Sequence, residues 1–426
     1  MVNVDISNVW GAVSLPELLG REREVFDAHQ KLRSHQAGGP DFLGWLSQPD
    51  HVQAWLIRGI ERAAEQIVSD AEVLVVCGVA EPASAARAAI EAYCGAGRNL
   101  LQTPQVLFVG SSLNSRQWLE LSRLLEDREY SLLLLSPTGQ ELGVNITARG
   151  LRWLMERKYG PTAKNRIFVS TLVGSPLHRM GQEEGYELFP MPRELGGSQS
   201  IFTAGALIPM AVAGIDPLDV LEGAVEAYEA TDVRSFENPA WLYAMARAVL
   251  AGQGRERELL CCFDHSLSAL GQWWRQSTWR WHTGSGTALT TETVLLPGEL
   301  SALESMAGNG RGRVFETLLH FAPMAKKVPV EMDWKDYDGL GFLSGRSLED
   351  VERQTAQALT DCHSLAGVPL VELDAGELTA QSLGALFLFL ELSSALTARL
   401  CGEEPFGPEP DAVRQRAIDQ LQGTDA

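Results

Sequence analysis

Cysteine and histidine are too sparse in this chain to suggest disulfide or metal chemistry. Among 426 residues there are six cysteines, none in a C-x-x-C pair, and eight histidines without metal-ligand spacing. Several of the cysteines sit within apolar runs, which is typical of small buried hydrophobes in a reducing compartment. We therefore expect no disulfide framework and no bound metal.

Positive charge is also scarce. Lys and Arg total 35 against 55 Asp and Glu, which gives a formal net charge of −20. So acidic a surface argues against nucleic acid or an anionic membrane as a partner. Any anion that binds this chain needs a local pocket of positive charge.

Long hydrophobic runs are missing as well. The most apolar stretches, 202–215 and 383–390, are too short to span a bilayer. The opening "MVNVDISNVW" has neither the basic start nor the apolar core of a signal peptide. These absences predict a soluble, cytoplasmic protein without a membrane partner.

The chain does contain apolar strand-like runs that alternate with amphipathic helical stretches, which indicates parallel sheets covered by helices. A Pro-rich segment, 187–197, interrupts this alternation and is our candidate connection between two domains. The expected strands are 73–78, 104–112, 130–136, 165–171, 258–264 and 367–374. The expected helices are one from about residue 83, then 116–127, 143–160, 238–252, 380–402 and 411–423.

The turn after the first of these strands carries an unusual pair of residues. Such strand–turn–helix units commonly cradle a phosphate with glycines and free N–H groups, yet Glu81 and Pro82 stand here. Pro82 suits the first position of a helix, and Glu81 can interact with the positive end of that helix. The residues themselves therefore favour a structural role for this turn.

Several segments, in order, resemble bacterial glucose-6-phosphate isomerase. They are "FLGWLSQPD" (42–50), "FPMPRELGGSQSIFTAGALIPMAVAGID" (189–216), "ENPAWLYAMARAVL" (237–250), "WW" (273–274), "GRVFETLLHF" (312–321) and "EEPFGPEPDAV" (403–413). The ordered set covers the chain from about residue 40 to residue 423.

The resemblance implies an α/β fold of two sugar-isomerase (SIS) domains, each a three-layer α/β/α unit with a mainly parallel sheet. It places an N-terminal helical segment at 1–40, the first domain at 41–195, the second at 196–405 and a helical tail at 406–426. The family interconverts glucose 6-phosphate and fructose 6-phosphate in glycolysis and gluconeogenesis, without metal or cofactor. It also implies a sugar phosphate or other small anion as ligand, and a homodimer.

The family's phosphate cradle is altered in this chain. Its first-turn Gly-Gly-Ser falls at Ala80, Glu81 and Pro82. The family's second turn is a run rich in lysine and hydroxyl residues, of which this chain keeps only part. Pro137 stands in the place of the lysine. Thr138 and Glu141 have the spacing of a helix capping box instead. The substrate-binding positions that the resemblance transfers are Ser136, Thr138, Gly139, Gln140, Gly196, Gly197, Ser198 and His363, of which Ser198 replaces a family arginine.

The family's proton-transfer positions are altered too. The glutamate base falls at Arg280, which cannot accept a proton at neutral pH. His282, two residues on, is the nearest group with a suitable pKa, but a role in capping the loop among Trp279 and Trp281 is the interpretation that we favour. The ring-opening histidine falls at Ser301, and the late glutamine and lysine fall near Pro408 and Arg414.

Two functions remain open from these substitutions. In the first, the chain is a catalytically inactive binding, regulatory or scaffold homologue, which pairs with itself or with an active paralogue. In the second, it is a divergent sugar-phosphate isomerase that uses Arg280, His282, Ser301 and Arg414 in new roles.

Overall fold

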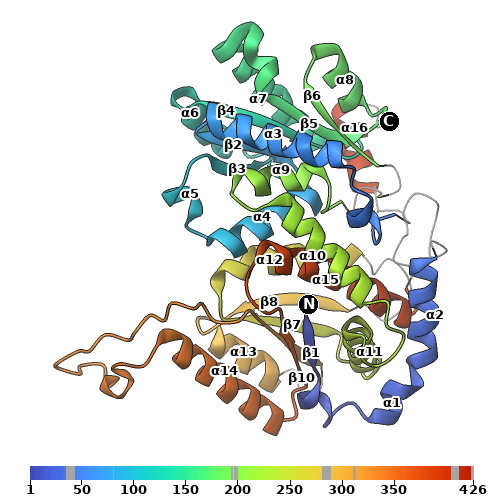
Figure 1. The fold of residues 1–426 in the computed structure, drawn as a ribbon, viewed down its shortest axis with the longest axis vertical. Helices are drawn as coiled ribbons and strands as arrows, with labels where there is room; N and C mark the ends of the chain where they lie inside the picture. Colours follow the sequence, from blue (N-terminus) through green and yellow to red (C-terminus); the bar gives the residue numbers. More distant parts are fainter. Residues whose placement is uncertain are drawn as a thin grey trace.

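The computed structural model describes residues 1–34, 44–79, 81–192, 195, 200–280, 289–309, 313–403 and 412–423, with the side chains of 279, 280 and 309 outside that description. Two five-stranded sheets organise this chain (Figure 1). The first sheet has the order β3-β2-β4-β5-β6, and the second has the order β1-β10-β9-β7-β8. The strands are β1 (Asn3–Asp5), β2 (Val73–Gly78), β3 (Gln105–Val109), β4 (Tyr130–Leu135), β5 (Ile167–Leu172), β6 (Glu187–Met191), β7 (Arg257–Cys262), β8 (Thr290–Leu295), β9 (Val314–His320) and β10 (Leu370–Asp374).

Helices surround both sheets. They are α1 (Leu15–Gly20), α2 (Glu22–Arg33), α3 (Ala54–Asp70), α4 (Glu81–Cys94), α5 (Arg98–Leu101), α6 (Ser115–Asp127), α7 (Leu142–Tyr159), α8 (Pro176–Glu184), α9 (Ala204–Val212), α10 (Pro217–Ala230), α11 (Pro239–Gly252), α12 (Ser268–Arg280), α13 (Leu300–Asn309), α14 (Leu348–Leu365), α15 (Ala380–Leu400) and α16 (Ala412–Gln422).

Alternate residues of each strand point to different cores, as the pleat of a sheet requires. Val73 and Val75 of β2 face a core shared with α6 and α7, whereas Leu74 and Val76 face a larger core shared with α3, α4 and α9. That larger core continues through α10, α11, α12 and α15 to the second sheet. The far face of the second sheet packs on α13 and α14. The molecule is therefore a stack in which helices separate the two sheets (Figure 1).

The expected α/β fold with mainly parallel sheets is confirmed. All pairings of the first sheet are parallel, and in the second sheet only the β1–β10 pairing is antiparallel. The amino-terminal segment, which we expected to be helical, contributes β1 as well as α1 and α2. The apolar run of β2 is wholly buried, as a strand covered on both faces should be.

The Pro-rich segment 187–197 is not simply a connection, which corrects our expectation. Its first part forms β6, the edge strand of the first sheet, with Pro190 opposite Thr171. An edge strand tolerates proline because one side of its backbone has no strand to pair with. The proline that suggested a break in the sequence is thus compatible with the end of a sheet.

Helix α15 is the one described helix that is long and apolar enough to cross a membrane. However, 94% of its most apolar window is buried inside the fold. It packs against α10 and α11. Its apolar character therefore belongs to the core.

Candidate functional site

The order of the first sheet marks the place where open parallel sheets bind ligands, and we call this place the crevice. After β2 the chain moves to one side to form β3 and then to the other side to form β4. In open parallel sheets, ligands bind outside the carboxyl ends of the two strands that flank such a reversal. The turns after β2 and β4 lie at this edge, and they begin α4 and α7. These are the two turns that the sequence singled out.

The first turn brings a buried carboxylate to the crevice. Glu81 is the first residue of α4, and its side chain is only 2% exposed. One carboxylate oxygen accepts a hydrogen bond from the backbone N–H of Ser200 at 3.0 Å. Glu81 thus sits at the positive end of the helix, as expected, and also reaches the chain beyond the glycine pair at 196–197.

The second turn is organised around another carboxylate, that of Glu141. The hydroxyls of Ser136 and Thr138 both donate to it, the latter at 2.8 Å. Ser136 Oγ in turn accepts from the N–H of Gly139 at 2.8 Å. Gly139 has φ of +71°, and an added Cβ would lie 3.1 Å from the backbone nitrogen of Leu177. The hydroxyl and amide donors of this turn therefore converge on a side chain of the chain itself.

This arrangement differs from the expected capping box. Helix α7 begins at Leu142, so Glu141 is its N-cap residue and not its third residue. One bond of the box is present, because the N–H of Thr138 donates to Oε1 of Glu141 at 3.5 Å, but Thr138 Oγ1 accepts from the N–H of Gln140 at 3.2 Å in place of that of Glu141. The capping-box prediction was therefore wrong, because the positive φ of Gly139 delays the start of the helix.

The carboxyl-terminal helix adds a cation to the second turn. Nη1 of Arg414, on α16, donates to the carbonyl oxygen of Gln140 at 3.4 Å. The two residues are 274 positions apart in the chain. The structure thus brings together Ser136, Thr138, Gly139, Gln140 and Arg414, five of the positions that the resemblance selected.

Two other selected positions lie elsewhere. Ser301 is exposed on α13, and His363 lies on α14, 7% exposed. Both helices cover the far face of the second sheet, at the opposite end of the molecule from α7 (Figure 1). Nδ1 of His363 lies 2.8 Å from Oε1 of buried Glu316, and this hydrogen bond raises the pKa of His363.

The remaining selected positions fall outside the described residues. They are Gly196, Gly197, Ser198, His282 and the side chain of Arg280. Within the described ranges, no group of three or more His, Cys, Asp or Glu side chains is placed to hold a metal ion. The described part of the crevice is therefore built from hydroxyls, backbone amides, two carboxylates and one arginine.

The sequence did not reveal the part that Glu141 plays. An acidic residue three positions after a threonine is common at helix starts, so it was interpreted as a cap. Its placement among the donors of Ser136 and Thr138 depends on the tight turn at Gly139. The one feature of the sequence that could have indicated this role was the acidic residue Glu141 within a turn otherwise rich in hydroxyl side chains.

Comparison with curated proteins identifies the family. The chain is 33% identical over 408 residues to glucose-6-phosphate isomerase of Symbiobacterium thermophilum, covering 94% of this chain and 91% of that protein. It is 30% identical over 413 residues to glucose-6-phosphate isomerase of Clostridium tetani, covering 95% and 92%. The chain belongs to the glucose-6-phosphate isomerase family. No protein-family model matches it.

Solved structures agree with this chain in fold. A hypothetical protein of Thermus thermophilus superposes with a TM-score of 0.87 at 19% identity, covering 99% of this chain and all of that one. A glucose-6-phosphate isomerase from Chlamydia trachomatis gives a TM-score of 0.73 at 16% identity, covering 96% of this chain and 85% of that chain. Both span the two α/β units, so the two-domain SIS architecture expected from the sequence is confirmed.

Proposed function

We propose that this chain is a glucose-6-phosphate isomerase homologue whose phosphate-binding and proton-transfer groups have been replaced. In this proposal it acts as a binding, regulatory or scaffold protein and does not interconvert sugar phosphates. The domain boundaries at 41–195 and 196–405 remain part of the proposal. Localisation in the cytoplasm, alongside the enzymes of glycolysis and gluconeogenesis, is part of it too.

The observation that carries the proposal is the position of Glu141. Its carboxylate accepts the hydroxyls of Ser136 and Thr138, groups that an incoming phosphate would need. The carboxylate of Glu81 similarly accepts a hydrogen bond from the backbone N–H of Ser200. A carboxylate about 4 Å from a phosphate oxygen repels it by roughly 4 kcal/mol per unit charge at an effective dielectric near 20. The two carboxylates therefore compete with a sugar phosphate for this crevice.

A coupled assay tests the proposal. Purified protein is given fructose 6-phosphate, and formation of glucose 6-phosphate is followed through its oxidation by a dehydrogenase. Glucose-6-phosphate isomerase from Symbiobacterium thermophilum serves as the positive control. We expect no turnover above the rate without protein, and robust turnover would overturn the proposal.

The second candidate is an active, divergent sugar-phosphate isomerase. The contact between Arg414 and Gln140 favours it, because a cation beside the second turn can hold an anionic substrate. In this reading Arg280, His282 and Ser301 take part in new roles. Replacing His282 and Arg414 together by Ala and Gln should then abolish any activity, and unchanged rates would exclude those two roles.

We further propose a sugar phosphate or another small anion as the ligand of the crevice. A thermal-shift screen across sugar phosphates and nucleotide sugars tests this proposal. A shift with fructose 6-phosphate that Arg414→Gln removes would support residual recognition of the family's substrate. A flat screen would favour a role in binding another protein.

The projecting arm, residues 322–347, supports a proposed dimer. It extends from the body between β9 and α14 (Figure 1). Its largest side chains face solvent, with Trp334 90% exposed and Tyr337 84% exposed. Exposed aromatic side chains gathered on one segment are typical of contact surfaces. A second copy of this chain is the occupant that we propose, as the family resemblance implies.

Light scattering after size exclusion tests the dimer. The doubly substituted Trp334→Ser/Tyr337→Ser protein should shift toward the mass of a monomer, 46.5 kDa. Leu365→Ser is the matched control, because Leu365 is also 90% exposed but lies at the end of α14, outside the arm. A wild-type monomer would contradict the homodimer, and co-purification of an active paralogue from the native host would point to the mixed dimer.

A further inference from the structure

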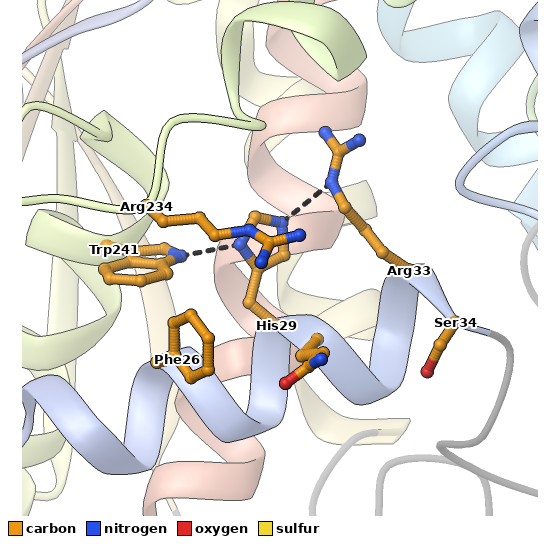
Figure 2. Close-up of a pocket in the computed structure, with 7 residues that line it drawn as sticks. Phe26, His29, Arg33, Ser34, Arg234 and Trp241 are labelled. Carbon is orange, nitrogen blue, oxygen red and sulfur yellow. Dashed lines mark hydrogen bonds between the residues drawn. The ribbon is translucent and has the colours of Figure 1, made fainter.

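A pocket far from the crevice in sequence gathers positive charge. It lies where the end of α2 meets the start of α11 and the preceding loop, and it has a volume of about 220 Å³ (Figure 2). Its lining residues are Phe26, His29, Gln30, Arg33, Ser34, Arg234 and Trp241. The composition of the chain requires a local positive pocket for any bound anion, and this pocket contains two arginines and no acidic lining residue.

Arg234 supplies one of the two cations of this pocket. Its guanidinium lies 5.6 Å from the ring centre of Phe26 and makes no hydrogen bond or ion pair with the described residues. In Figure 2 its side chain extends toward His29, and burial, the charge of Arg33 and then the charge of Arg234 lower the pKa of that imidazole. Arg234 is itself exposed, so solvent screens part of its charge, but no carboxylate of the described residues pairs with it at this pocket.

Arg33 is held in place from several sides. Its guanidinium stacks on the ring of Tyr228 at 4.1 Å, and it donates to the Tyr228 carbonyl oxygen. Nε of Arg33 lies 3.4 Å from a carboxylate oxygen of Asp232, which is itself half exposed. A cation fixed in this way loses little further conformational entropy when it binds an anion. Two cations therefore face the pocket against one partly solvated carboxylate.

His29 leaves the pocket with more donors than acceptors. The indole N–H of Trp241 donates to Nδ1 of His29 at 2.8 Å, and Nε of Arg33 points at Nε2 at 3.1 Å. A neutral imidazole has one acceptor nitrogen, and its other nitrogen carries a hydrogen. Whichever tautomer is present, one N–H of the ring faces another N–H donor. An oxyanion beside Arg33 would accept from such donors and would offset both positive charges.

We propose that this pocket binds a small oxyanion, a metabolite that bears phosphate or carboxylate groups. Arg234 and Arg33 hold the charged oxygens. The amide of Gln30 and the hydroxyl of Ser34, which also line the pocket, contact hydroxyl groups on the remainder of the ligand. The site is independent of the crevice at Glu141, so it stands whether or not the proposed loss of isomerase activity is correct.

Isothermal titration of the full chain with citrate, inorganic phosphate and 3-phosphoglycerate tests the proposal. Arg234→Gln should weaken binding of at least one of these anions by about tenfold or more, the value of one charge-assisted hydrogen bond. Arg23→Gln is the matched control, since Arg23 lies on α2 and is exposed. It is about 15 Å from Arg33 along the helix axis, and its substitution should leave binding unchanged.

Two further readouts separate this site from the crevice. The affinity of the α2 pocket for the anion should be unchanged in the Arg414→Gln variant, because this substitution alters the crevice only. The side-chain nitrogen resonances of His29 should shift on titration, because the anion binds beside the ring. Equal affinity of wild type and Arg234→Gln for all three anions, or no binding at millimolar concentration, would overturn the proposal. Phosphate binding lost in Arg414→Gln but retained in Arg234→Gln would overturn it as well.

Discussion

Arg247 of α11 and Glu258 of β7 form an ion pair in which neither side chain has any exposed surface. Two guanidinium nitrogens, Nη2 and Nε, lie 2.8 and 3.1 Å from Oε2 of Glu258. The other carboxylate oxygen accepts from the hydroxyls of Tyr243 and Thr317 at 2.6 and 2.7 Å. The pair therefore joins α11 to β7, an interior strand of the second sheet, through bonds that are shielded from solvent.

Removing the charge of Glu258 should leave the buried Arg247 guanidinium uncompensated. We expect Glu258→Gln to lower the free energy of unfolding by about 3–5 kcal/mol, as measured by urea denaturation. Glu292→Gln is the matched control, because Glu292 pairs with Arg257 at the surface, where both side chains are more than 40% exposed. The Glu292→Gln variant should lose about 1 kcal/mol or less of its free energy of unfolding. Equal losses would contradict a structural role for the buried pair.

Glu141→Gln should improve anion binding at the crevice. The change removes a negative charge and releases the hydroxyls of Ser136 and Thr138 from a carboxylate. We expect inorganic phosphate to bind roughly tenfold more tightly, as one charge-assisted hydrogen bond becomes available. Titration calorimetry in the Arg234→Gln background measures this without the pocket beside α2. Glu126→Gln, at the end of α6 near the opposite edge of the sheet, should change nothing, and a similar gain there would refute the role of Glu141.

Acid should destabilise the fold through His29. Burial, together with the neighbouring Arg33 and Arg234, lowers the pKa of His29 from 6.5 to about 4, and Asp232 opposes this shift. Between these values the unfolded chain binds a proton that the folded chain does not. The contribution of His29 to the free energy of unfolding is therefore fully present above pH 6.5. It falls by about 3 kcal/mol as the pH approaches 4. Urea denaturation at several pH values should show this loss, with a shallower slope for His29→Gln.

His363 should have the opposite pH dependence. Its hydrogen bond to Glu316 raises its pKa above 6.5, so the folded chain holds a proton that the unfolded chain releases. The stabilisation is fully present below pH 6.5 and is lost as the pH rises through the raised value. His363→Gln should remove this alkaline loss in the same denaturation series. His178→Gln should retain it, and an identical profile for both variants would argue against the prediction.

The crossing of α10 and α15 requires glycine at Gly384. A Cβ added there would lie 1.9 Å from the carbonyl oxygen of Val220, so the helices would have to separate. We expect Gly384→Ala to lower the unfolding free energy by about 3 kcal/mol or more, because overpacking displaces backbone. Gly308→Ala, in α13 with open space around it, should be neutral or slightly stabilising. Thermal unfolding of the two variants decides the matter.

Periodicity made part of the regular structure of this fold predictable, although the buried strand β9 was not among the expected strands. β2, β4 and β5 are apolar runs buried on both faces, and each was expected within two residues of its observed bounds. Strand β8 was missed because its sequence, "TTETVL", is too polar to signal a buried strand. β1 was missed because three residues carry almost no pattern. Both strands pair with a neighbouring strand that is buried under helices. This tertiary context is not visible in a short stretch of sequence.

By itself the sequence determined the family, the parallel α/β architecture and the replacement of the family's lysine by Pro137. These follow from the order of segments and from hydrophobic patterns, which are local properties of the chain. Only the tertiary structure decided that Glu141 accepts from the donors of its own turn, that Arg414 reaches Gln140, and that His29 and Arg234 line one pocket. The first depends on the positive φ of Gly139, and the other two depend on how helices and turns pack across long separations. Neither kind of arrangement leaves a periodic signal in a sequence.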